Sequence, residues 1–139
     1  MTRPSLLALG LGVYSAVAFS APLGDLRVTD SRGVEVVVRA PVRRIVSLNS
    51  DAAEILRAIG ARGQLVGVSN LSGKAKSFWG DMADIPSVGD PFGPNIEKII
   101  QLKPDLVLAV AWRPGPDFDK KLKEFGIPTL RLDCYDPLR

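Results

Sequence analysis

Hydrophobic positions along the chain follow two periods that alternate from about residue 26 onward. Short apolar, β-branched runs typical of strands are separated by segments whose apolar residues recur every three to four positions, as in helices. The first two runs flank the turn sequence Asp30-Ser31-Arg32-Gly33 and predict a small hairpin of residues 26–30 and 34–38. Further strands are predicted at residues 44–48, 64–68, 85–88, 106–111 and 127–132.

Helices are predicted between these strands, at residues 51–59, 74–82, 95–103 and 117–125. The first is preceded by the capping residues Asn49, Ser50 and Asp51, and Asp51 and Glu54 have the spacing of a capping box. One face of that helix carries apolar residues at i, i+3, i+4 and i+7, namely Ala52, Ile55, Leu56 and Ile59. In the last two helices the predicted caps are Asn95 and Asp117, and the predicted inward residues include Ile96, Ile99, Ile100, Phe118, Leu122 and Phe125.

This order predicts an α/β fold, a parallel sheet flanked by helices in a Rossmann-like lobe, preceded by a small β-hairpin. Right-handed crossovers place the strand-to-helix loops at one edge of the sheet, where ligands bind in such folds. The candidate site is therefore a set of loops at residues 49–51, 69–71, 90–95, 112–115 and 133–135.

Residues 1–20 differ from the rest of the chain. Arg3 precedes an almost wholly apolar run, Leu6 to Val17, and Ala18-Phe19-Ser20 places small residues at positions −3 and −1 of a cut before Ala21. This is the layout of a secretory signal peptide, and the run is shorter than the roughly 20 residues that span a bilayer. We expect residues 21–139 to be exported to the periplasm or the extracellular space, with no lipoprotein cysteine after the apolar run.

Composition narrows the chemistry. The 139 residues contain no histidine and one cysteine. The net charge is +3, and the charged residues are interspersed rather than clustered. These counts disfavour histidine-dependent catalysis, imidazole metal sites, internal disulfides and nucleic-acid binding. Binding, carboxylate chemistry and chemistry performed by a bound cofactor remain open at this point.

Candidate binding residues lie in the strand-end loops. Phe92, Trp112 and Tyr135 can form flat apolar walls for a large ligand, or can pack locally under their loops. Arg113 can pair with an anionic group, or remain solvated. Ser50 lies at a helix start, where free N–H groups favour anions, but helix capping is the preferred interpretation of this residue. The carboxylate pairs Asp81/Asp84 and Asp117/Asp119 are interpreted as capping and surface residues.

Several segments, in this order, resemble the periplasmic binding proteins of ABC importers for iron–siderophore, haem and cobalamin. They are Val28 to Gly33, Pro41 to Leu48, Leu65 to Ser69, Asn95 to Val107 and Phe125 to Pro128. The resemblance implies a carrier that holds a metal chelate between two lobes and delivers it to a membrane permease. Such a carrier is not an enzyme, has no intrinsic cofactor and binds no metal directly. Glu97 would be the permease-docking glutamate of the N-terminal lobe.

The resemblance also implies ligand contacts from the strand-end loops: Asn49, Ser50, Asn70, Phe92, Trp112, Arg113 and Tyr135. Residues 21–139 would form the N-terminal lobe alone, because the family's connecting helix and second lobe come after this point. We expect this lobe to be a monomer. Two alternatives stay open. One is a small secreted flavodoxin-like enzyme that uses a cofactor at the strand ends, and the other is a one-lobe protein-binding or sensory module.

Overall fold

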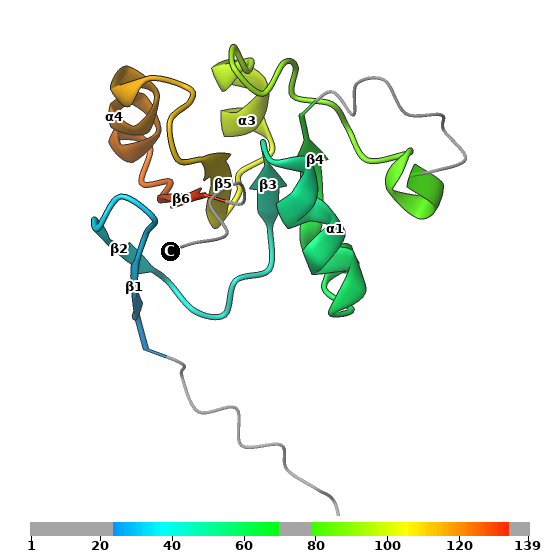
Figure 1. Ribbon diagram of the computed structural model, residues 1–139, viewed down its shortest axis with the longest axis horizontal. Coiled ribbons are helices and arrows are strands. Elements are labelled where there is room, and N and C mark those ends of the chain that lie inside the picture. The colour runs from blue at the N-terminus through cyan, green and yellow to red at the C-terminus, as the bar shows by residue number, and fades with distance from the viewer. Residues whose placement is uncertain (1–23, 70–78, 134–139) are drawn as a thin grey trace, which may run out of the picture.

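The computed structural model describes residues 24–69 and 79–133, and the predicted signal segment lies outside them. Within this part, a two-stranded antiparallel hairpin stands beside a four-stranded parallel sheet (Figure 1). The hairpin consists of β1 (Leu26–Thr29) and β2 (Glu35–Val38). Leu26 is opposite Val38, and Thr29 is opposite Glu35, so the turn falls where the sequence predicts it.

The sheet consists of β3 (Ile45–Ser47), β4 (Leu65–Val68), β5 (Leu106–Val110) and β6 (Thr129–Leu132). Its strand order is β4-β3-β5-β6, and all three neighbouring pairs are parallel. This confirms the predicted fold class. The strand predicted at residues 85–88 is reduced to a single β-bridge between Val68 and Ser87.

Among the described residues, the α-helices between these strands are α1 (Ser50–Ala58), α3 (Ile96–Gln101) and α4 (Pro116–Glu124). Single 3-10 turns occupy Arg62–Gln64 and Gly80–Met82. Of the helix predicted at residues 74–82, the structure describes residues 79–82, which include the second of these turns.

The predicted caps at Asn49 and Asn95 are confirmed, whereas the capping box predicted at Asp51 and the cap predicted at Asp117 are wrong. Helix α1 is capped by Asn49, whose side chain accepts hydrogen bonds from the N–H groups of Asp51 (2.9 Å) and Ala52 (3.2 Å), so no capping box starts at Asp51. Helix α4 begins after Gly115, with Pro116 at a first-turn position where its missing N–H costs nothing. Asn95 does cap α3, accepting from the N–H of Lys98 at 2.9 Å.

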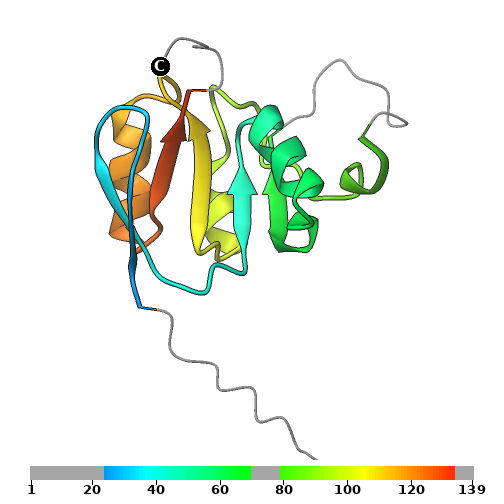
Figure 2. The same cartoon turned by 60° about the horizontal axis from the view of Figure 1, so that its bottom comes forward.

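The two faces of the sheet are covered differently. Val46, Val107 and Ala109 belong to a core cluster with Ile99 of α3 and Leu122 of α4, and all of these side chains are buried. On the opposite face Ile45, Leu106 and Leu108 cluster with residues of α1 and with Val38 of the hairpin. Figure 2 shows α1 in front of β3 and β4, with no helix in front of β5 and β6. Every residue of β5 is buried, as predicted for a central parallel strand.

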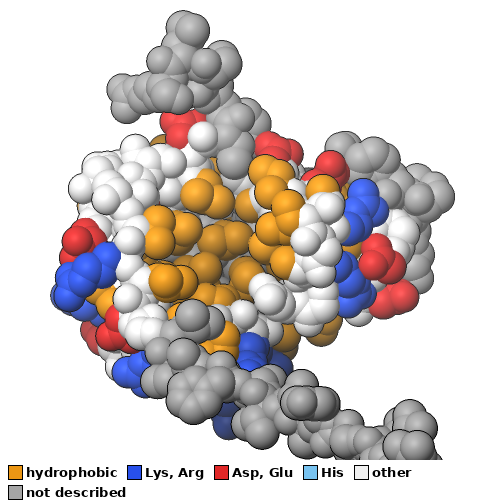
Figure 3. Space-filling view, turned by 90° about the horizontal axis from the view of Figure 1, so that it is seen from below, with side chains coloured by type: hydrophobic (Ala, Val, Ile, Leu, Met, Phe, Trp, Pro, Cys, Tyr) orange, Lys and Arg blue, Asp and Glu red, His pale blue; other side chains and the backbone are white. Residues whose placement is uncertain are grey.

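The partly covered face leaves hydrophobic side chains accessible. Figure 3 shows them gathered on the side of the molecule that is seen from below. Ile55 and Ile59 of the predicted apolar face are 57% and 70% exposed, and only Ala52 of that face is fully buried. Phe125, predicted to point inward, is 61% exposed. The periodicity found the apolar face of α1 correctly, but no described element covers its outer part.

Candidate functional site

The carboxyl ends of β3, β4 and β5 surround a hollow of about 210 Å³, where the sequence predicts a binding site. Its lining combines the ends of the strands with the loops that follow them: Leu48, Ser50, Ser69, Pro91, Phe92, Val110 and Trp112. Three of these residues, Ser50, Phe92 and Trp112, are predicted binding residues. Of the other four, Ser69 and Pro91 lie in loops that the sequence predicts at the site, whereas Leu48 and Val110 are strand-end residues that the sequence does not single out.

Hydrogen bonds among residues 47–69 fix the strand ends next to the hollow. The Ser47 hydroxyl donates to the carbonyl of Asn49 at 2.7 Å, and the N–H of Ser69 donates to the carbonyl of Ser47 at 2.9 Å. Asn49 is 4% exposed and its side-chain oxygen caps α1. These bonds fix the start of α1, and therefore the position of Ser50, the first residue of this helix.

The loop that carries Phe92 is shaped by its own backbone. Gly89 has φ +99°, a conformation that side chains rarely adopt, and it forms a β-bridge with Pro94 that closes the loop. Inside the loop, the carboxylate of Asp90 accepts from the N–H of Phe92 at 2.8 Å. This turn presents the Phe92 ring toward the edge of the sheet.

Phe92 and Trp112 meet across the hollow. Their ring centroids are 5.5 Å apart and their planes are inclined by 28°, a stacked arrangement. The rings are nevertheless 50% and 57% exposed. The side chains therefore pack on each other and still offer aromatic surface to solvent, which combines the two interpretations that the sequence left open.

Arg113 extends this aromatic pair with a positive charge. Its guanidinium carbon lies 5.9 Å from the centroid of the Phe92 ring, within the range of a cation–π contact. In the part of the chain that the structure describes, no carboxylate lies within ion-pair distance of Arg113. A β-bridge between Val110 and Arg113 folds this loop back on β5. The site thus has a flat aromatic surface with a guanidinium at its rim.

The remaining predicted residues are placed as follows. Asn70 and Tyr135 lie outside the described residues, as does Cys134. Glu97 is exposed in the first turn of α3, two positions after the cap Asn95. Asp119, interpreted from the sequence as a surface residue, instead forms ion pairs with Arg131 and Arg32, at 2.5 Å and 3.1 Å.

Residues 24–69 and 79–133 contain no group of three or more His, Cys, Asp or Glu side chains that could hold a metal ion. Within the same ranges, no helix has the length and apolarity to cross a membrane.

Residues 45–133 match the family model described as periplasmic binding protein. The chain belongs to this family. Similar proteins include a vitamin B12-binding protein of Vibrio parahaemolyticus, 38% identical over 89 residues, which are 63% of this chain and 30% of that protein. An uncharacterised ABC transporter substrate-binding lipoprotein of Bacillus subtilis, YvrC, is 33% identical over 108 residues, or 76% of this chain and 33% of that protein.

Solved structures of the family share the fold. The molybdate periplasmic binding protein MolA of Haemophilus influenzae superposes with a TM-score of 0.71 at 25% identity, over 78% of this chain and 35% of that one. The iron-uptake substrate-binding protein PiuA of Streptococcus pneumoniae superposes with a TM-score of 0.65 at 26% identity, over 79% and 37%. The chain thus spans about a third of the length of these family members.

Proposed function

We propose that this chain supplies one ligand-binding lobe of an ABC-importer carrier for a metal chelate. A corrinoid is the first candidate ligand, and haem or a ferric siderophore is the next. The observation that best supports this proposal is the stacked Phe92–Trp112 pair, with Arg113 at its rim, at the carboxyl edge of the parallel sheet. The family membership and the vitamin B12-binding relative support the choice of ligand class.

The geometry suits a large planar ligand. Half-exposed aromatic rings bury apolar ring surface and stack on conjugated systems. The Arg113 guanidinium complements an anionic or amide-bearing substituent of the ligand through charge-assisted hydrogen bonds. In this proposal the chelator ligates the metal, and the protein provides walls and orientation without reacting with its cargo.

Residues 21–139 correspond in this proposal to the N-terminal lobe of the carrier, exported by residues 1–20 and monomeric in the periplasm. A hollow of about 210 Å³ at the sheet edge covers only one side of a corrin or porphyrin. The other side would be enclosed by a second lobe. Tight capture is therefore expected of the two-lobed form, and weaker binding of this chain alone.

A titration with cobalamin, haemin and a ferric siderophore tests the ligand class. The chain holds two tryptophans, of which Trp112 is 57% exposed and Trp79 is 3% exposed. Binding should quench the Trp112 fluorescence, whereas Trp112→Phe, which keeps Trp79, reports absorption of light by the ligand alone. Calorimetry provides the affinity without optical interference. Absence of heat and of quenching for all three ligands, in this chain and in a two-lobed form, would overturn the proposal.

Glu97 is proposed to dock on the permease, because a carboxylate exposed in the first turn of α3 can reach basic residues of a partner. Glu97→Arg should abolish association with the cognate permease in detergent or nanodiscs, while cobalamin affinity stays unchanged. Glu124→Arg makes the same charge reversal at an exposed position of α4 and should leave association intact. Equal loss in both variants would show a general charge effect and refute the docking role.

A further inference from the structure

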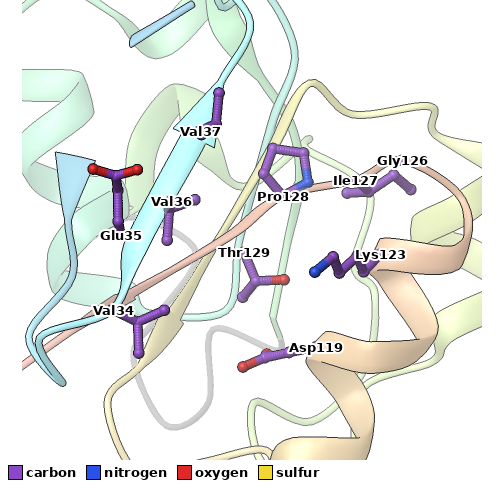
Figure 4. A pocket seen from close by; sticks show the side chains of 10 residues that line it. All are labelled: Val34, Glu35, Val36, Val37, Asp119, Lys123, Gly126, Ile127, Pro128 and Thr129. Carbon is purple, nitrogen blue, oxygen red and sulfur yellow. The ribbon is translucent and has the colours of Figure 1, made fainter. Parts of the chain in front are cut away.

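A second cavity, of about 380 Å³, lies between the hairpin and α4, and shares no lining residue with the hollow at the carboxyl edge. One wall is the chain from Val34 to Val37, and the other is formed by α4 and the segment from Gly126 to Thr129. Figure 4 shows the side chains of these segments around the opening. Its volume falls in the range of small-molecule sites.

Thr129 provides an unsatisfied polar group in this cavity. The residue is 9% exposed, and its hydroxyl oxygen is buried without a hydrogen-bond partner in the structure. A buried hydroxyl that forms no hydrogen bond costs free energy, on the order of 1–3 kcal/mol. The hydroxyl can donate one hydrogen bond and accept others, so a polar ligand atom beside it would relieve this cost.

The charges around the cavity leave one cation in excess. Asp119 is paired with Arg131 and with Arg32, and Arg32 is also paired with Asp30, so these two guanidiniums and two carboxylates balance. Glu35 is paired with Arg27 at 2.6 Å. Among the described residues, no acidic group lies within ion-pair distance of Lys123. In Figure 4 the Lys123 ammonium and the Thr129 hydroxyl point into the same part of the cavity.

The remaining walls are apolar. Val34, Val36, Ile127 and Pro128 line the cavity, and Val34 is 48% exposed. A ligand that satisfies this lining has an anionic head for Lys123 and Thr129 and a hydrocarbon tail for the valine and proline surfaces. Burial of each tail methylene contributes about 0.8 kcal/mol.

We infer that this cavity is a binding site for a medium-chain aliphatic carboxylate, with Lys123 and Thr129 holding the carboxylate and β2 and the Gly126–Thr129 segment holding the tail. The ammonium pairs with one carboxylate oxygen, and the threonine hydroxyl donates to the other. Neither residue takes part in the proposed chelate site, so the two proposals stand or fall separately.

Octanoate is the probe, followed by calorimetry and by amide chemical shifts in ¹⁵N–¹H correlation spectra of the full chain. We expect saturable shifts confined to residues 34–37 and 123–129. Acetate, which lacks the tail, and 1-octanol, which lacks the charge, should bind at least about tenfold more weakly, as loss of roughly 1.4 kcal/mol implies.

Lys123→Gln and Thr129→Val should each weaken octanoate binding by about tenfold, since a hydrogen bond to a charged group contributes about 1.5–3 kcal/mol. Lys121→Gln is the matched control, because Lys121 is exposed on the same helix but does not line the cavity. Thermal melts establish that each variant is folded. Absence of saturable shifts, equal binding of octanol, or unchanged affinity in both cavity variants would overturn the inference.

Discussion

Trp112 stacks on Phe92 with ring centroids 5.5 Å apart, although one ring follows β5 and the other belongs to the loop before α3. The contact links two strand-end loops and keeps both rings about half exposed. The two rings together therefore form one continuous aromatic surface. If they were apart, each ring would only pack against its own loop.

The aromatic pair should contribute to ligand affinity and little to stability. Trp112→Ala and Phe92→Ala are each expected to weaken cobalamin binding by about tenfold, the loss of roughly 1.4 kcal/mol of contact energy. The melting temperature should change little, because both rings are exposed. Phe125→Ala, which removes a ring that is 61% exposed outside the site, should leave affinity unchanged. Calorimetry measures the affinities, and an equal effect of all three variants would contradict a specific aromatic surface.

A buried arginine should make Asp119 important for stability. Arg131 is 1% exposed, bonds to both carboxylate oxygens of Asp119, and donates to the carbonyl of Val110 at 2.9 Å. Asp119→Ala leaves this guanidinium buried without its carboxylate and should lower the free energy of unfolding by about 3 kcal/mol. Urea denaturation measures the loss.

Glu124→Ala, on the exposed side of α4, should change the free energy of unfolding by less than about 0.5 kcal/mol. If Asp119→Ala behaves like Glu124→Ala, the Arg131–Asp119 pair does not stabilise the fold.

Asp30 should make stability depend on pH. Burial by itself raises the pKa of Asp30, but hydrogen bonds from the backbone N–H groups of Val34 and Arg32, together with the Arg32 guanidinium, lower it below its usual value. A pKa that is lower in the folded state stabilises the fold above the unfolded-state pKa of about 3.9, and this contribution is lost as pH falls through the folded-state pKa.

Asp30→Asn should therefore melt at a lower temperature than the parent at pH 7, with a difference that shrinks below about pH 4. Thermal melts followed by circular dichroism between pH 7 and pH 2.5 measure it. A constant difference across this range would mean that Asp30 acts through hydrogen bonds that do not depend on its charge.

Gly67 should be intolerant of a side chain. A Cβ at this position in β4 would lie 2.7 Å from Cδ1 of Leu102, 3.1 Å from Cγ1 of Val88 and 3.2 Å from Cγ2 of Val46. Gly67→Ala is expected to cost about 1–3 kcal/mol through overpacking. Gly63→Ala introduces the same group where nothing lies within 4 Å and should be close to neutral. Chemical denaturation compares the two, and equal stabilities would show that Leu102 moves aside without cost.

Local pattern was sufficient for much of the fold. The turn at residues 30–33 predicts the hairpin, and the continuous apolar run at residues 106–111 predicts a strand buried on both faces. The site was predictable in part, because parallel topology brings strand ends to one edge whatever their distance along the chain. Phe92, Trp112 and Arg113 meet there for that reason.

Other features depend on contacts that no local pattern encodes. The sequence predicts capping residues at 49–51 but does not decide which of them caps α1. The structure selects Asn49, since the cap depends on where β3 ends and the chain turns. The apolar period of α1 identifies Ile55 and Ile59 as one face but does not reveal that this face is left uncovered. Asp119 looks like a surface carboxylate until Arg131, twelve positions later on β6, is packed beside it.

By itself, the sequence determined the order of strands and helices, the parallel sheet and the edge at which binding residues gather, because side-chain periodicity and chain connectivity leave few other solutions. Only the tertiary structure decided which aromatic rings stack, which charges neutralise each other, and which polar group stays unsatisfied. The Thr129 hydroxyl and the Lys123 ammonium come from a strand and a helix, and only packing of α4 against β6 places them in one cavity.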